Sequence, residues 1–309
     1  MSVTSPQAVQ SREEPVYRPF HVEVRRAERL SPSFLRVTFT GELDDFADHG
    51  LDQRIKLVLP LAGEDPGYGF LDGTPDWFGA WRALADDRRN PLRTYTVRGL
   101  RRDPAELDVD FVLHGDSGPA TRWANRVTPG DRLVVVGPNA RCAGSTRALE
   151  WAPPPGADRL LLAGDETAVP AICSIVSALP PGVRGRVLLE VPDPGDALPL
   201  AAPAGVEVSW LPRPHGAAHG DLLIPAVAGA VRDLAAPAAP APVDLEDVDI
   251  DTAILWESAA GEGGDGFYAW LAGEAGMVKT LRRVLVRDAG VNRSSVAFMG
   301  YWRLGRAEN

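Results

Sequence analysis

The first half of the chain consists of short segments in which apolar and polar residues alternate, separated by glycine, proline and aspartate. Alternation with a period of two predicts half-buried strands, and several such strands in succession predict a small antiparallel barrel. Residues 62–91, which include Trp77, Phe78 and Trp81, break this rhythm and predict a long excursion that carries a short helix. The predicted strands span residues 21–24, 34–39, 54–59, 93–97, 107–113 and 132–136.

The second half alternates longer apolar runs with helical stretches, which predicts a parallel sheet covered by helices on both faces. Between the halves, three prolines and Gly156 can continue neither a helix nor a central strand. We therefore expect two domains, a β-barrel domain over residues 15–151 and an α/β domain over residues 157–309. The predicted strands span residues 159–163, 187–191, 206–210, 252–256, 267–271 and 296–302, and the predicted helices span 166–179, 222–234 and 274–288.

Composition and charge narrow the class of protein. The 309 residues are 45% hydrophobic, which is enough for two cores, and the net charge of −10 argues against a nucleic-acid partner. Cys142 and Cys173 are too few for an iron–sulfur cluster, and we expect two buried thiols rather than a disulfide. An N-terminus without an apolar signal core, and no run of about 18 apolar residues, predict a cytoplasmic protein that does not enter a membrane. We assign no function to the Ala/Pro-rich residues 235–243.

Two neighbouring segments of the first half carry candidate chemistry. In the 93–98 segment, Arg93 and Tyr95 fall on one face of a strand and Thr96 on the other, a pattern that by itself also suits an ordinary edge strand. The 114–121 segment leads from a strand through a glycine turn into a helix, where free backbone N–H groups can bind an anion such as a pyrophosphate. Gly118 would permit close approach, Pro119 suits a first helical turn, and the Thr121 hydroxyl can reach a phosphate.

In the second half of the chain, two segments likewise lead from a predicted strand into a predicted helix. Residues 164–168 close one strand and open a helix, but they lack the Gly-x-Gly-x-x-Gly fingerprint of dinucleotide-binding folds. The segment is therefore either an anion site or a helix start that Asp165 or Thr167 caps, and both readings can hold together. Residues 270–274 have the same geometry and are expected beside the first segment at the ligand edge of the sheet.

Together, these motifs resemble those of known protein families. Arg93-Thr94-Tyr95-Thr96 followed by a Gly118 to Thr121 helix start resembles the ferredoxin-reductase-like flavoproteins. The fuller string from His114 to Ala120, with residues 164–171 and 270–274, is similar to the siderophore-interacting proteins, which are flavin-dependent ferric-siderophore reductases. The resemblance covers the chain from about His21 to Gly305. It implies an N-terminal antiparallel Greek-key β-barrel that holds FAD, followed by a C-terminal α/β domain that admits NADPH or NADH.

The resemblance also implies residue roles. Tyr95 would pack against the isoalloxazine, Arg93 would meet the phosphates and Thr96 would bond near the flavin N5. Asp116 would either bind a ribose hydroxyl or cap the turn, and His114 would contribute mainly its backbone. The expected FAD contacts are Arg93, Thr94, Tyr95, Thr96, His114, Gly115, Asp116, Gly118, Pro119, Ala120 and Thr121. The expected nicotinamide contacts are Gly164, Asp165, Glu166, Thr167, Ala168, Ala272, Gly273 and Glu274, and the acidic residues among them predict weak, transient binding.

The implied reaction passes a hydride from NAD(P)H to the flavin and then single electrons to Fe(III) in a ferric siderophore. No protein acid, base or metal ligand is required, because the cofactor carries the chemistry. Lys56, Arg141 and Lys279 are the candidate substrate-binding cations, since many ferric siderophores are anionic. Arg141 would replace the arginine that the family often carries directly after Gly137-Pro138.

Two other functions remain open at this point: a general flavin or ferredoxin-type reductase, and a siderophore-binding protein that is not an enzyme. The siderophore and the oligomeric state are also open. Glu190, at the end of a strand, is either a ligand of a free ribose hydroxyl, which would favour NADH over NADPH, or a surface residue.

Overall fold

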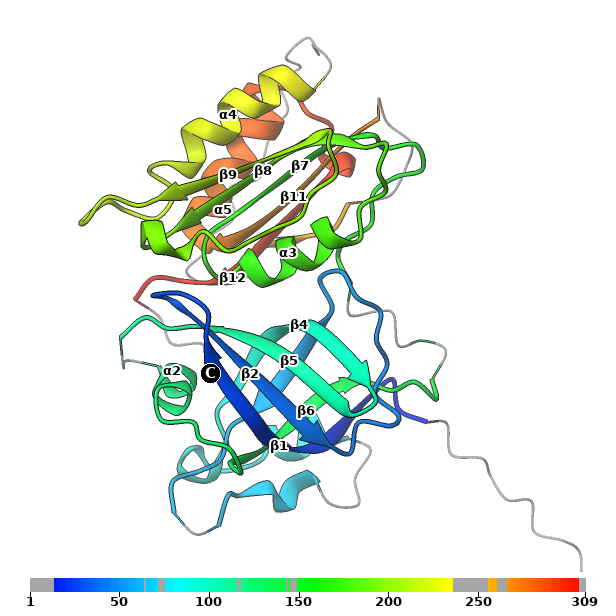
Figure 1. The fold of residues 1–309 in the computed structure, drawn as a ribbon, viewed down its shortest axis with the longest axis vertical. Helices are drawn as coiled ribbons and strands as arrows, with labels where there is room; N and C mark the ends of the chain where they lie inside the picture. The colour runs from blue at the N-terminus through cyan, green and yellow to red at the C-terminus, as the bar shows by residue number, and fades with distance from the viewer. Residues whose placement is uncertain are drawn as a thin grey trace, which may run out of the picture.

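The computed structural model describes residues 14–63, 65–71, 76–115, 118–142, 144, 149–235, 255–259 and 266–305. The N-terminal part is a closed barrel in the strand order β1-β2-β5-β4-β3-β6, in which every described pairing is antiparallel. This confirms the predicted barrel, drawn in the lower half of Figure 1. Its strands are β1 (Tyr17–Arg29), β2 (Phe34–Gly41), β3 (Arg54–Val58), β4 (Leu92–Arg102), β5 (Ala105–Val112) and β6 (Arg132–Pro138).

The barrel buries apolar side chains on its inside and on part of its outside. Alternate positions such as Phe39, Leu57 and Val109 fill the interior, as period-two strands require. The outer face of β3 and β6 packs against the excursion between β3 and β4, where Val58 and Val136 contact its aromatic residues. The excursion contains the predicted short helix, α1 (Trp77–Arg82), flanked by the 3-10 turns η1 (Tyr68–Leu71) and η2 (Asp86–Arg88).

The C-terminal part is a six-stranded sheet in the order β10-β12-β11-β7-β8-β9. Its strands are β7 (Arg159–Gly164), β8 (Arg184–Val191), β9 (Val206–Pro212), β10 (Trp256–Glu257), β11 (Phe267–Glu274) and β12 (Val296–Trp302). Five strands run parallel, which confirms the predicted parallel sheet, and the two-residue edge strand β10 pairs antiparallel with β12. Of the strand expected over 252–256, residues 252–254 lie outside the described residues.

Helices cover both faces of this sheet, as the apolar pattern of its strands requires. Helix α3 (Val169–Ser177) lies on the face that is turned toward the barrel, and α4 (Leu223–Leu234) and α5 (Ala275–Arg282) lie on the other face (Figure 1). The helix predicted from residue 166 begins only at Val169, because Asp165 and Thr167 form a hydrogen-bonded turn first. The helix predicted to run to residue 288 does so, with a π-helical turn over Arg283–Asp288.

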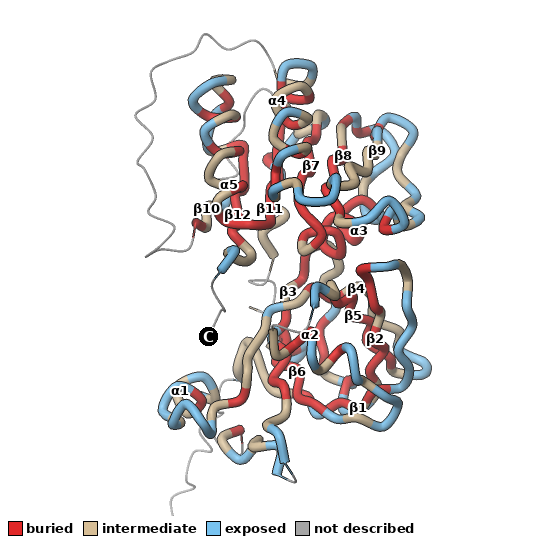
Figure 2. Tube along the Cα trace, turned by 90° about the vertical axis from the view of Figure 1, so that its left-hand side faces the viewer, coloured by how far each residue is buried: buried red, intermediate tan, exposed pale blue. Residues whose placement is uncertain are grey.

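Buried hydrogen bonds join the barrel to the sheet, and buried residues continue through both parts (Figure 2). Asp52, which precedes β3, accepts bonds from the Trp151 backbone N–H at 3.1 Å and from the Trp270 indole on β11 at 3.2 Å. Asp196, between β8 and β9, accepts bonds from the Ser31 hydroxyl at 2.6 Å and the Ser33 N–H at 2.8 Å. The predicted domain boundary between residues 151 and 157 stays a prediction.

The structure also describes the environment of both cysteines and the length of the helices. Both cysteines are free thiols; Cys173 is buried, but Cys142 is partly exposed, so the prediction of two buried thiols is half wrong. In the part of the chain that the structure describes, no helix combines the length and the apolar character that crossing a bilayer requires.

Replacing Asp196 with alanine should lower the free energy of unfolding by about 1–3 kcal/mol, because buried N–H donors would lose their acceptor. Chemical denaturation followed by circular dichroism measures the change. Asp233→Ala is the matched control, since its exposed ion pair with Arg186 should contribute at most about 1 kcal/mol. Equal effects of the two substitutions would contradict the assigned role of Asp196.

Candidate functional site

Strand β4 presents its polar residues on two faces. Ile55 lies opposite Tyr95 and Leu57 lies opposite Arg93, and residues directly opposite each other in an antiparallel pair share a face. Arg93 and Tyr95 therefore share one face, and Thr94 and Thr96 share the other, as the alternation predicted.

Tyr95 stands at the end of an aromatic row that runs from β4 to the helix α2 (Pro119–Ala124). Its ring centroid lies 4.4 Å from that of Phe111, and the Phe111 ring lies 5.5 Å from that of Trp123 on α2. Burial raises the pKa of Tyr95 above its usual value, so the phenol is neutral at physiological pH. The row brings Trp123, near the end of α2, beside Phe111, which also packs with Tyr95.

Among the described residues, none caps the start of α2 with its side chain. Gly118 is the N-cap residue, and a Cβ added there would meet only the Thr121 hydroxyl, at 3.9 Å. Gly115 has a φ of +60°, and an added Cβ there would meet nothing within 4 Å. Thr121 and Ala120 are buried on the helix, while His114 is exposed. Asp116 lies outside the described residues.

These residues fit a flavin with a pyrophosphate arm. The first turn of α2 offers backbone N–H groups for which the described part of the chain shows no side-chain cap, and such groups bind phosphate oxygens. Arg93 adds a guanidinium from the neighbouring strand, where its Nη1 also donates to the Leu92 carbonyl at 2.9 Å. The half-buried Tyr95 ring offers an aromatic surface for a flat ring system.

The second group of predicted residues lies at the carboxyl edge of the sheet. Gly164 on β7 pairs with Ala272 on β11, so residues 164–168 and 272–274 lie side by side, as predicted. The fully buried Asp165 joins them: its Oδ2 accepts bonds from the Glu274 N–H at 2.7 Å and the Trp302 indole at 2.9 Å, and its Oδ1 accepts from the Thr167 N–H at 2.9 Å. Asp165 thus bonds the turn before α3, but the helix itself has Ala168 as its N-cap residue and no side-chain cap, so the prediction that Asp165 or Thr167 caps it is wrong. The anion-site reading of this segment stays a prediction.

Burial shifts the pKa values of two side chains at this edge. Desolvation, with a smaller contribution from the neighbouring Glu166 carboxylate, raises the pKa of Asp165 to about 7. Burial also lowers the pKa of His219, whose Nδ1 lies 4.0 Å from Glu166.

The sequence reasoning missed Arg213, which follows β9 and organises the acidic residues of the edge. Its guanidinium donates two bonds of 2.8 Å to Glu166 and one of 3.2 Å to Glu190. Asp165, Glu166 and His219 have potential metal-ligating atoms within 4.8 Å of one another, but Arg213 already occupies both oxygens of Glu166. We therefore interpret the cluster as an ion-pair network and assign no metal to it.

The structure does not bring the three candidate substrate cations together. Lys56 is exposed on β3 and donates to the Thr94 hydroxyl at 2.6 Å, on the face that also carries Thr96. Arg141, beyond the end of β6, pairs with Asp45 at 2.6 Å. Lys279 lies on α5 in the other part of the chain. Lys56 alone among them borders the Thr94–Thr96 segment.

A closed antiparallel barrel followed by a sheet with helices is the architecture of ferredoxin-reductase-like flavoproteins. A ferredoxin reductase of carbazole 1,9a-dioxygenase superposes with a TM-score of 0.58 at 15% identity, over 93% of this chain and 70% of that one. Two family models match in succession: the siderophore-interacting FAD-binding domain over residues 23–142 and the siderophore-interacting protein over residues 157–305. The chain belongs to the siderophore-interacting protein family, as the motifs predicted.

Relatives along nearly the whole chain agree with this assignment. The siderophore-interacting protein SipS from Aeromonas hydrophila superposes with a TM-score of 0.67 at 31% identity, over 95% of this chain and 94% of that chain. The ferric vibriobactin reductase ViuB of Vibrio cholerae is 29% identical over 92% of this chain and 89% of its own length. An uncharacterized protein of Mycobacterium tuberculosis is 34% identical over 94% of this chain and 93% of its own length. These matches support a siderophore-related flavin reductase, and thus an oxidoreductase.

The raised pKa of Asp165 predicts a pH-dependent stability. The folded state holds the proton up to about pH 7, whereas an unfolded aspartate releases it near pH 4, so the free energy of unfolding should fall as the pH rises between these values. Asp165→Asn removes this dependence, so the wild-type protein should lose about 1 kcal/mol or more relative to the variant across the range. Urea unfolding at a series of pH values measures it, with the exposed Asp233→Asn as control. A wild-type protein that gains stability relative to Asp165→Asn over this range would contradict the assignment.

Proposed function

We propose that the protein is an FAD-dependent reductase that takes electrons from NADPH or NADH and delivers them to Fe(III) in a ferric siderophore. The observation that carries this proposal is the aromatic row that joins Tyr95 on β4 to Trp123 on the glycine-capped helix α2, in a chain of the siderophore-interacting family. Bound FAD would supply two-electron acceptance from a nicotinamide and one-electron delivery to iron.

The residues of the barrel bind and orient the cofactor. Arg93 and the first N–H groups of α2 hold the phosphates, and the Thr121 hydroxyl adds a neutral bond. Tyr95 supports the isoalloxazine through its ring, which Phe111 holds in place from behind. Thr96 presents a hydroxyl to the edge of the ring system from the opposite face of β4.

The substrate class rests on the relatives and on local charge. Two relatives are named ferric vibriobactin reductase and ferric acinetobactin reductase, which supports iron held by an organic chelator as the electron acceptor. In a chain of net charge −10, a local cation is needed to attract an anionic chelate. Lys56 is exposed on the same face as Thr96, so we propose it for this task.

One experiment separates this proposal from its alternatives. The purified protein is reduced anaerobically with NADH or NADPH and then mixed with a panel of ferric siderophores, while its visible spectrum is recorded. Flavin reoxidation by ferric siderophores, faster than by free flavin or ferredoxin, is the expected result. A protein that binds ferric siderophore but no flavin would instead be a binding protein, and preference for ferredoxin would indicate a ferredoxin-type reductase.

The cofactor should be FAD, and Arg93→Ala should raise its dissociation constant by about tenfold to a hundredfold. Loss of a charge-assisted bond costs about 1.5–3 kcal/mol, whereas Thr121→Ala should cost about 0.5–1.5 kcal/mol and His114→Ala less. Fluorescence titration of the apoprotein with FAD measures the three constants. Arg132→Ala, an exposed arginine of β6, is the matched control. Release of FMN from the purified protein, or a largest effect for His114→Ala, would contradict these assignments.

Lys56→Ala should slow the reduction of anionic ferric siderophores and raise their apparent KM, because the approaching chelate loses an attracting charge. Its rate should also depend less on ionic strength, since such attraction is screened over about 10 Å at 0.1 M salt. Stopped-flow measurement of both half-reactions is the test, with Arg25→Ala on β1 as the charge-matched control. Flavin reduction by nicotinamide should be unchanged; equal slowing of both half-reactions would assign Lys56 to the flavin site instead.

A further inference from the structure

Acidic side chains bond backbone N–H groups along the carboxyl edge of the sheet, in the turn before α3 and at the starts of α4 and α5. In open α/β folds, the N–H groups at these places are the usual partners of a dinucleotide's pyrophosphate. Here the turn before α3 is bonded by Asp165, and the start of α5 is bonded by Glu274, which accepts from the Met277 N–H at 2.9 Å.

Glu190 lies at the third of these places, which is the start of α4. It is fully buried at the end of β8, and its carboxylate accepts bonds from the N–H groups that open α4, Leu222 at 3.1 Å and Leu223 at 2.8 Å, and from Gly220 at 2.8 Å. Arg213 donates a fourth bond at 3.2 Å. Glu190 is therefore neither a surface residue nor an available ligand for a ribose hydroxyl, so both readings of it from the sequence are wrong.

The glycines of this edge serve internal packing rather than the approach of a ligand. A Cβ on Gly164 would lie 2.4 Å from the Ala168 Cβ and 2.6 Å from the Ala272 carbonyl oxygen. Gly273 has a φ of +145°, and a Cβ there would lie 2.7 Å from the Asp165 carboxyl. In both places the missing side chain makes room for the protein's own atoms, unlike the open space at Gly115 and Gly118.

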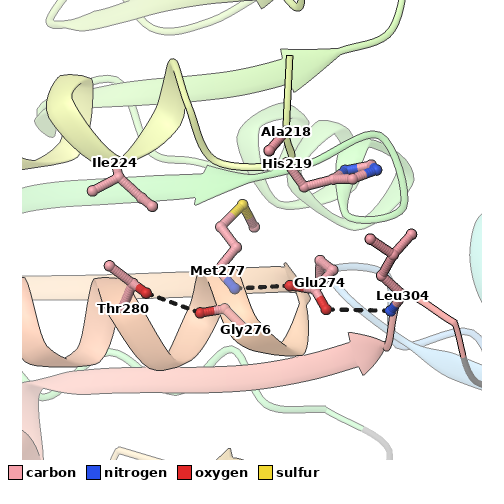
Figure 3. A pocket seen from close by; sticks show the side chains of 8 residues that line it. All are labelled: Ala218, His219, Ile224, Glu274, Gly276, Met277, Thr280 and Leu304. Carbon is pink, nitrogen blue, oxygen red and sulfur yellow. Dashed lines mark hydrogen bonds between the residues drawn. The ribbon is translucent and has the colours of Figure 1, made fainter. Parts of the chain in front are cut away.

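The cavity at this edge offers few partners for a phosphate. It measures about 270 Å³ and lies between the segment before α4 and the first turns of α5 (Figure 3). The two oxygens of its carboxylate, Glu274, already accept bonds from Met277 and Leu304, as the dashed lines in Figure 3 show. None of the eight described residues that line it is a lysine or an arginine: Ala218, His219, Ile224, Glu274, Gly276, Met277, Thr280 and Leu304.

We propose that Glu190 and Glu274, which bond the starts of α4 and α5, and Asp165, which bonds the turn before α3, exclude the adenosine diphosphate moiety of the electron donor from this edge, so that the protein recognises a nicotinamide donor through its nicotinamide half alone. This inference rests on the proposed use of NAD(P)H. The donor site would then make no binding contact with the 2′-phosphate or with the adenosine diphosphate moiety. NADH, NADPH and reduced nicotinamide mononucleotide then reduce the flavin with similar, weak apparent affinities.

Stopped-flow reduction of the FAD-loaded protein by the three donors tests the proposal. The expected result is apparent dissociation constants that agree within about threefold, with little dependence on salt, since phosphate contacts would make binding weaken as salt increases. A dinucleotide that binds tenfold or more tightly than the mononucleotide would overturn it. So would a preference for NADPH that disappears in Lys279→Ala, because this cation on α5 would then hold the 2′-phosphate.

A binding measurement keeps the proposal testable without turnover. Calorimetric titration of the wild-type protein with ADP-ribose should show no binding in the millimolar range, and micromolar binding would overturn the proposal. Glu190→Gln and Glu274→Gln, which weaken the internal caps, should each raise the affinity for ADP-ribose at least threefold. The exposed Glu207→Gln on β9 is the matched control and should change nothing.

The two proposals fail in different ways. If no nicotinamide donor reduces the flavin, the proposed donor is wrong, yet absence of ADP-ribose binding would still support closure of the edge. If all donors reduce the flavin but ADP-ribose competes strongly, the donor is right and the closure is wrong.

Discussion

The position of the barrel on the sheet depends on the buried carboxylate of Asp52. It accepts bonds from the segment that leaves the barrel, at Glu150 and Trp151, and from Trp270 inside β11. Asp52 lies two residues before β3, so its bonds tie the strand that carries Lys56 to the strand that ends at Glu274. Asp196 adds a second tie between the barrel and the sheet. Electron transfer between a donor at the sheet and an acceptor at the barrel requires such a fixed spacing.

The two halves of the proposed site treat backbone N–H groups in opposite ways. In the barrel, no described residue caps the start of α2 with its side chain and the space around its glycines is open, which suits a cofactor that stays bound. At the sheet edge, buried carboxylates satisfy the N–H groups from within, which suits a donor that leaves after each turnover. Under the proposed function, the open helix start would hold the cofactor tightly, and the helix starts that the protein bonds internally would leave the electron donor loosely held.

The sequence predicted the elements well where local pattern determines them, and less well where distant residues meet. The alternation around Arg93 and Tyr95 and the glycine turn before Pro119 are local signals, and both appear at the predicted places. Arg213 was missed because its partner Glu166 lies 47 positions earlier in the chain, and no periodicity marks such a pair. Glu190 was misread for the same reason, since the N–H groups that it caps belong to a helix that begins 33 positions later.

The two-residue strand β10 also bears on how the protein behaves in a crowded solution. It pairs antiparallel with β12, and Trp256 lies between the guanidinium of Arg54, 4.5 Å from its ring, and the stacked ring of Tyr301. An edge strand whose backbone groups are unpaired can recruit the same edge of another molecule. By pairing with Phe298 and Met299, β10 occupies backbone groups of β12 that would otherwise be open to such recruitment at this edge.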